Sequence, residues 1–177
     1  MREADHNLAR ACAQGNRNAQ QTLYEQYKTP LYRLCLRYAR DAQEAEDFLH
    51  DAFLRIFKDI RQYEGKGALG GWLRRVALNN TLQHLRRHQH WLPVEEQGDW
   101  AEEEEAELPP PPPMAELLAH IQQLPAGYRT VFNLYVLEQY SHQDIARELG
   151  ISVGASKSQL SKAKAQLRRQ LSAATTT

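Results

Sequence analysis

The chain has 177 residues, 42% of them hydrophobic, which is enough to fill the core of one large or two small domains and excludes wholesale disorder. Its formal net charge is zero, with 22 basic and 22 acidic residues, and at first this argues against a nucleic-acid-binding protein. The chain contains no run of about 18 apolar residues, so we expect a protein of the cytoplasm without a membrane-spanning segment.

Two helices are predicted in the first part of the chain. Over residues 19–40, apolar side chains recur on one side, and Pro30 is expected to kink the helix. Over residues 45–60, apolar side chains follow an i, i+3, i+4, i+7 stripe. Asp41, with Glu44 three residues later, is typical of the N-cap of this second helix.

A glycine-rich loop is predicted over residues 65–71, and a helix with several arginines over residues 72–88. Trp72, at the start of this helix, is expected in the core. His84 and His88 are four residues apart, a spacing that can bind a metal, but no third ligand of a suitable type is evident. We therefore expect no metal site and no bound cofactor.

The middle of the chain, residues 92–114, is predicted to be a linker between two domains, 1–91 and 115–177. Eight acidic residues and no basic ones lie within 95–107, and five prolines follow at 109–113. Like charges repel, and polyproline is extended without internal hydrogen bonds, so this composition does not favour a core element. The rest of the chain has 22 basic against 14 acidic residues, so both domains are basic and nucleic-acid binding is again open.

The second domain is predicted to be all-α, like the first, with helices that begin near Ala115, Ala126, Ser141 and Ser152. Its last two helices have the pattern of a helix-turn-helix. Ser141 with Asp144 is typical of a capping box, and Gly150 supplies the left-handed residue that ends a helix.

The side chains around this turn have predicted roles in packing and in binding. Ile145, Ala146 and Leu149 are expected to face a core, and Ile151 and Val153 to anchor the next helix. That helix, predicted over residues 155–171, has basic residues and no acidic one, which favours a major groove. The basic residues are Lys157, Lys162, Lys164, Arg168 and Arg169.

Two long segments resemble the conserved regions of extracytoplasmic-function (ECF) sigma factors of bacterial RNA polymerase. The second conserved region resembles YEQYKTPLYRLCLRYARDAQEAEDFLHDAFLRIFKDIRQYEGKGALGGWLRRVALNNTLQHLRR, and the fourth resembles LPAGYRTVFNLYVLEQYSHQDIARELGISVGASKSQLSKAKAQL. The resemblance implies two helical domains that bring core polymerase to promoters and help to open them.

The resemblance also implies three sets of binding residues. The polar face of the helix over 45–60 is expected to dock on the β′ subunit of core polymerase, through Asp47, His50, Asp51, Leu54 and Lys58. The glycine loop and the helix after it are expected to hold the opened strand of the minus-ten element, through Glu64, Lys66, Arg74, Arg75, Asn79, Arg86 and Arg87. The second helix of the helix-turn-helix is expected to read the minus-thirty-five element in duplex DNA, through Lys157, Ser158, Gln159, Ser161 and Lys162.

Three residues depart from what the family usually has at these places. His50 replaces a common glutamine, Ser156 a frequent aliphatic residue, and Gln159 a frequent arginine. The partners expected from the resemblance are the β′ and β subunits of core polymerase, promoter DNA and an anti-sigma factor, with no small-molecule substrate and a monomer when free. Catalytic activity is not expected, because paired carboxylates are abundant only in the linker, where nothing would position them.

Two other functions remain open at this point. A helix-turn-helix regulator could bind duplex DNA as a dimer and use its first domain for sensing or dimerisation. Alternatively, a protein-interaction module could use its helical faces on partners and never touch DNA, although it would not need the excess of basic residues.

Overall fold

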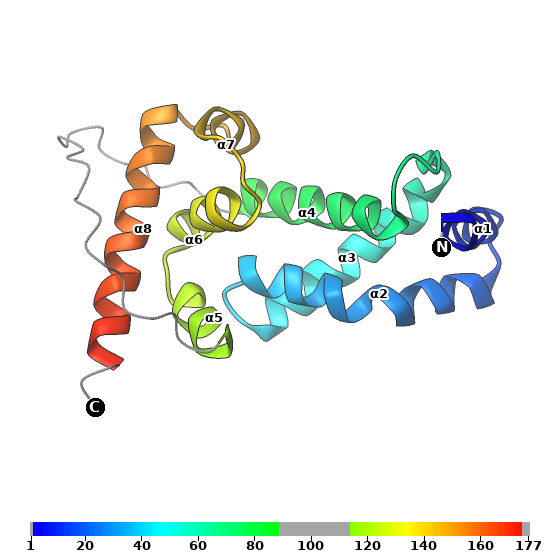
Figure 1. Cartoon of the computed structure of the whole chain (residues 1–177), viewed down its shortest axis with the longest axis horizontal. Coiled ribbons are helices and arrows are strands. Elements are labelled where there is room, and N and C mark those ends of the chain that lie inside the picture. Colours follow the sequence, from blue (N-terminus) through cyan, green and yellow to red (C-terminus); the bar gives the residue numbers. More distant parts are fainter. Residues whose placement is uncertain (1, 89–113, 175–177) are drawn as a thin grey trace. The chain divides into compact units, whose positions relative to one another are not determined.

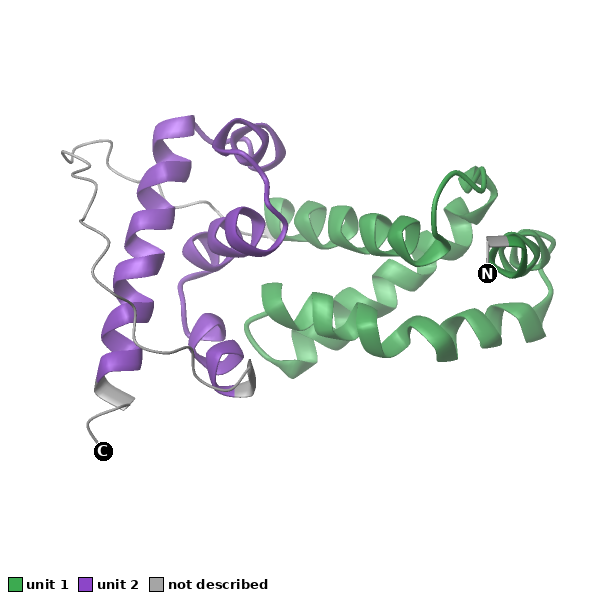
Figure 2. Ribbon diagram, in the orientation of Figure 1, with its two compact units in different colours: residues 1–87 green, residues 88–177 purple. Residues whose placement is uncertain are grey.

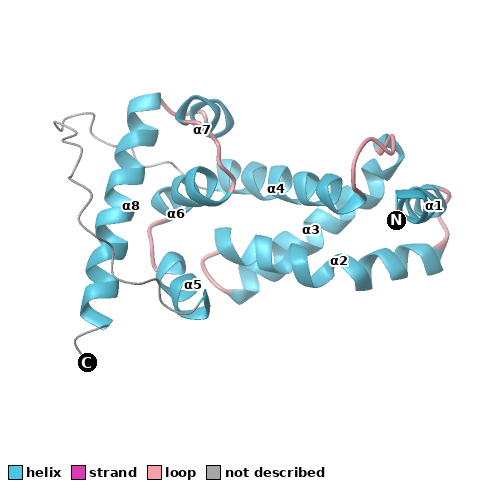
Figure 3. Cartoon of the chain, in the orientation of Figure 1, coloured by secondary structure: helices cyan, strands magenta, loops and turns pink. Residues whose placement is uncertain are grey.

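A computed structural model describes residues 2–88 and 114–174, and within these ranges every regular element is a helix (Figure 3). The described residues fall into two compact units, 1–87 and 88–177 (Figure 2). This agrees with the predicted all-α fold in two domains. The predicted acidic and proline-rich linker lies outside the described residues except for its last position.

The first unit contains four α-helices and one short 3₁₀ turn (Figure 1). The elements are α1 Arg2–Ala13, α2 Arg17–Tyr38, α3 Ala42–Asp59, η1 Ile60–Gln62 and α4 Leu69–His88. Helix α1 was not predicted. Helix α4 begins three residues earlier than expected, so that the last glycines of the predicted loop belong to its first turn.

Local capping residues explain where the helices of this unit begin. The Asp41 carboxylate accepts a hydrogen bond from the Glu44 amide at 2.8 Å, which confirms the predicted N-cap of α3. Asn16 caps α2 in the same way, accepting from the Ala19 amide at 3.1 Å. Pro30 lies inside α2, and the helix continues beyond it to Tyr38.

The core of the first unit lies between α2, α3 and α4. Its largest fully buried side chains come from all three helices. The stripe predicted on α3 faces this core and leaves the opposite side of α3 to solvent. The buried set includes Leu34, Tyr38, Phe48, Ile56, Leu73 and Leu82.

The second unit starts its helices where the sequence predicts. Its elements are α5 Met114–Gln122, α6 Ala126–Phe132, η2 Asn133–Leu137, α7 His142–Leu149 and α8 Val153–Ala174. The five-residue element η2 is a π-helical turn that continues α6, with the Glu138 amide bonded to the Asn133 carbonyl at 3.1 Å. The sequence pattern does not predict this turn.

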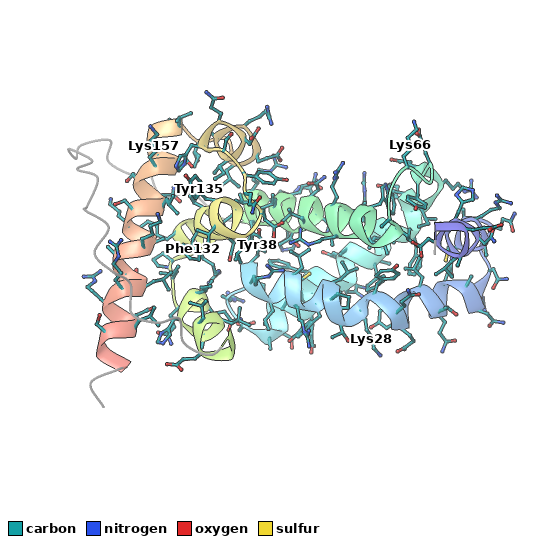
Figure 4. The ribbon with its side chains drawn as sticks, viewed as in Figure 1. Lys28, Tyr38, Lys66, Phe132, Tyr135 and Lys157 are labelled. Carbon is teal, nitrogen blue, oxygen red and sulfur yellow. The ribbon has the colours of Figure 1, made fainter. Side chains whose placement is uncertain are left out.

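A small hydrophobic cluster joins α5 and α6 to the C-terminal half of α8. Its buried members are Ile121, Leu124, Ala163 and Leu167. Phe132, which is labelled in Figure 4, packs against them. The buried Arg129 side chain connects α6 to the end of α5 and the turn after it. Its guanidinium donates to the carbonyls of Gln122 at 2.8 Å and Leu124 at 3.3 Å.

The turn between α7 and α8 forms as predicted. Ser141 and Asp144 make the complete capping box, and Gly150 adopts the left-handed conformation with φ of 68°. Val153 does not anchor α8, however, since it is 40% exposed. The first turn of α8 is held instead by the Ser152 hydroxyl, which accepts from the Ala155 amide at 3.0 Å.

Candidate functional site

A polar stripe runs along the solvent side of α3. Asp47, His50, Leu54 and Lys58 are exposed, and Asp51 is half-buried with its carboxylate 3.7 Å from the His84 imidazole of α4. These positions are three or four residues apart, so they share one face of the helix. Leu54 is 58% exposed among charged neighbours, which makes it the most prominent apolar side chain of this face.

Beside this stripe, α2 and α3 form an open groove that the sequence did not reveal. Its wall on α2 is made by Tyr24, Lys28 and Tyr32, at helical spacing of four residues. On the α3 side the groove is lined by Asp47 and His50, two members of the polar stripe. The exposed surface of α3 therefore continues across the groove onto aromatic side chains of α2. Lys28 is one of the residues labelled in Figure 4.

The loop before α4 is shaped by its glycines and by Tyr63. Gly65 and Gly67 have φ of 75° and 98°, a region that favours glycine, and the Tyr63 hydroxyl donates to the Gly67 carbonyl at 2.8 Å. Lys66 and Glu64 are exposed and form an ion pair at 2.5 Å (Lys66 is labelled in Figure 4). The loop thus has a fixed backbone and a locally neutral tip.

Two aromatic residues stand at the base of this loop. Tyr63 is 7% exposed, and its ring centroid lies 6.0 Å from that of Trp72. Trp72 is half-buried, which agrees only in part with its expected place in the core.

Helix α1 contacts the same loop and the residues just before it. The Arg61 guanidinium donates to the Ala13 carbonyl at the end of α1, with Nε and O 3.2 Å apart. The imidazole of His6 lies so close to Gly65 that a Cβ added there would come within 3.0 Å of its Nδ1 atom. A helix that the sequence did not predict therefore holds the loop in place.

The predicted polar residues of α4 divide between two faces. Arg75, Asn79 and Arg86 are exposed and lie within about 40° of one another around the helix axis. Arg87 is also exposed, about 120° from Arg75, and Arg74 is half-buried on another side. The structure thus brings three of the five together on one surface.

On α8, the structure separates the predicted residues into exposed and buried ones. Lys157, Ser161 and Lys162 are exposed. Ser158 and Gln159 are 0% and 3% exposed, so the prediction that they face DNA is wrong in this structure. Gln159 lies on the face of α8 that turns toward the protein interior, one turn before Ala163. Ser158 has no exposed surface with which to meet a base.

The exposed cations of α8 form two flanks. Lys157 and Lys164 lie within about 20° of each other, and so do Lys162 and Arg169, while the two pairs are about 140° apart. All four side chains are exposed, and Ser161 lies between the pairs. Lys157 is labelled near the start of α8 in Figure 4.

Comparison with known proteins places the chain in a family. The model of Sigma-70 region 2 matches residues 23–90, and that of Sigma-70 region 4 matches residues 114–167. The ECF RNA polymerase sigma factor SigW of Bacillus subtilis is 30% identical over 175 residues, which cover 89% of this chain and 91% of SigW. The chain belongs to the ECF sigma factors.

A second curated relative agrees with this assignment. The sigma-H factor of Pseudomonas aeruginosa is 28% identical over 182 residues, covering 96% of this chain and 94% of the relative. Among solved structures, the sigma factor RpoE of Bartonella quintana, crystallised with the anti-sigma factor NepR, is similar in fold, with a TM-score of 0.50. It is 17% identical, and the match covers 86% of this chain and 96% of that one.

As a sigma factor, the protein binds core RNA polymerase, directs it to specific promoters and promotes the opening of DNA. The regulator and the interaction module are thereby set aside. In the part of the chain that the structure describes, no helix is long and apolar enough to cross a membrane, and no cluster of three metal-ligating residues occurs.

Proposed function

We propose that this sigma factor divides its task among three surfaces, one for each kind of partner. The polar stripe of α3 and the aromatic wall on α2 would bind the β′ subunit of core polymerase. The loop over 64–68 and the exposed face of α4 would hold the opened strand of the minus-ten element. The exposed side of α8 would read the minus-thirty-five element as a duplex.

The observation that carries the proposal is the charge of α8. No acidic residue occurs in the 22 residues of this helix, and its exposed lysines lie beyond a turn closed by Gly150. Basic side chains on a helix that follows such a turn are suited to bind the phosphates on either side of a major groove. Lys157 and Lys162 contribute one cation to each flank.

The opened strand is proposed to bind where the loop and α4 meet. Arg75, Asn79 and Arg86 offer two cations and an amide on one exposed face, suited to phosphates and base edges. The ordered glycine turns beside Tyr63 allow a flipped base to approach the backbone closely. Opening then requires no energy source in this chain, because binding the unpaired strand shifts the equilibrium.

The test is a set of single substitutions in the full chain, each combined with purified core polymerase. Leu54→Ala should weaken binding to core, Arg75→Ala should slow formation of the open complex, and Lys162→Ala should weaken binding to duplex DNA that contains the minus-thirty-five element. Arg33→Ala changes an exposed arginine outside all three surfaces and serves as the matched control. Equal loss of core binding and of duplex binding in Lys162→Ala would contradict the division.

Further partners follow from the same surfaces. An anti-sigma factor is proposed to cover the polymerase-binding stripe, as one accompanies the solved sigma factor of Bartonella quintana. Exposed apolar side chains at Tyr135, Val136 and Leu137 offer a second surface for a protein partner, either the β subunit or the anti-sigma factor. We propose that the free protein is a cytoplasmic monomer without catalytic activity, in which residues 92–114 act as an acidic spacer.

A further inference from the structure

His142, the first residue of α7, is held by two neighbours. Its Nδ1 atom lies 2.9 Å from the Ser156 hydroxyl of α8. Its ring stacks on Tyr135 of η2, with the ring centroids 4.6 Å apart and the planes 24° apart. These contacts fix the imidazole between three elements of the second unit, and its orientation is determined before any ligand binds.

The bond to Ser156 selects one tautomer of the imidazole. Ser156 is fully buried, and His142 is the hydrogen-bond partner of its hydroxyl among the described residues. A buried O–H proton without an acceptor is costly, and Nδ1 is the acceptor that lies next to it, so we infer that the Ser156 hydroxyl donates to Nδ1. The proton of the neutral ring then resides on Nε2, which is a donor without a partner in the described part of the chain.

Burial, with two nearby lysines, favours the neutral form of the His142 ring. Burial, followed by the positive charges of Lys157 and Lys164, lowers the pKa of His142 below its ordinary value. Asp144 lies about 160° away around α7, and its carboxylate is engaged by Ser141 and by Arg147 at 2.6 Å. At neutral pH the ring is therefore a neutral donor beside two cations.

We propose that His142 donates a hydrogen bond from Nε2 to a phosphate oxygen of duplex DNA at the minus-thirty-five element. The inference rests on the proposed role of α8 in reading the duplex. In a helix-turn-helix, the second helix enters the groove and the first crosses the DNA backbone. His142 is at the start of that first helix, next to the Lys157 flank that attracts phosphate.

Two conservative substitutions separate phosphate binding from a purely structural role. The amide nitrogen of glutamine lies near the position of Nε2, whereas that of asparagine lies near the position of Nδ1. We expect His142→Gln to bind a promoter duplex nearly as tightly as the unsubstituted protein, and His142→Asn and His142→Ala to bind about tenfold more weakly. The measurement is fluorescence anisotropy of the holoenzyme on labelled duplex DNA. Retained affinity in His142→Asn with loss in His142→Gln would overturn the proposal in favour of a structural role.

Salt dependence distinguishes a neutral donor from a cation. Affinity falls as salt rises, and the steepness of this fall counts the counterions that are released on binding. Lys157→Ala should make the slope of log affinity against log salt shallower by about one, because one fewer counterion is released. His142→Ala should leave that slope unchanged, since a neutral ring displaces no counterion. A slope lowered by about one in His142→Ala would refute the neutral donor.

The phosphate itself can be found with uncharged backbone substitutions. Duplexes with single methylphosphonates across the minus-thirty-five element should include one position that weakens the unsubstituted protein but does not weaken His142→Ala further. Absence of any such position overturns the proposal. If Lys157→Ala also binds duplex DNA normally, the assignment of α8 as the duplex-reading surface fails as well, a result distinguishable from failure of His142 alone.

Discussion

Arg129→Met should destabilise the second unit while leaving the first unit intact. Arg129 is 3% exposed, and its guanidinium donates to the carbonyl of Gln122, the last residue of α5, and to that of Leu124, two residues further on. Methionine keeps the apolar stem but removes both donors, which costs about 1–3 kcal/mol for each buried carbonyl left without this partner. Since the bond to Leu124 is long and methionine avoids burying a charge, we expect a net loss of about 2–3 kcal/mol.

This loss is large relative to the stability of a domain of this size, for which about 0.05–0.15 kcal/mol per residue is typical. Amide hydrogen exchange followed by mass spectrometry of the full chain measures both units at once. Exchange in α5, α6 and α8 should accelerate by about 30- to 150-fold, with no change in α2, α3 and α4. Arg169→Met, on the exposed side of α8, is the control and should change neither unit. Unchanged protection in Arg129→Met would refute the role assigned to the buried guanidinium.

Three further predictions concern a turn, a histidine and the thiols. Gly150→Ala should lower the free energy of unfolding of the second unit by about 1 kcal/mol in urea titrations, because φ is 68° while the space for a Cβ is open. His142 has a lowered pKa in the folded state, so its contribution to stability is complete above its unfolded pKa of about 6.5 and is lost as the pH falls. Thermal unfolding should therefore show a loss of stability of the second unit between about pH 7 and 5 that is smaller in His142→Gln. Burial raises the pKa of Cys35 to about 11 and that of Cys12 as well, so both thiols should resist iodoacetamide at pH 8 in native protein and react rapidly in urea. Fast labelling of the native protein would show that these helices open readily.

Much of the fold could be predicted because its signals are local. The carboxylate of Asp41 and the capping box of Ser141 mark helix starts within three residues of sequence, and Gly150 marks an end by its backbone conformation. The apolar stripe of α3 similarly predicts which side of that helix is left for a partner.

The features that were missed depend on tertiary contacts. Helix α1 has one large apolar residue, Leu8, and its place next to the loop involves Arg61 and the closeness of His6 to Gly65. The π-helical turn η2 arises from one extra residue in the hydrogen-bond pattern after α6, which no periodicity reveals. The motif predicts that Gln159 faces DNA, yet its direction around α8 is set by packing against the protein interior.

The two flanks of α8 have a mechanical consequence for the proposed complex with duplex DNA. If Lys157 and Lys162 contact phosphates on the two strands, α8 cannot rotate about its own axis, because a rotation that brings Lys157 nearer to one strand moves Lys162 away from the other. Rotation is the motion that would exchange the side chains that meet the bases. In this proposed complex, phosphate contacts with no sequence preference of their own would hold Ser161 toward the bases, so that promoter choice would depend in part on side chains that touch no base.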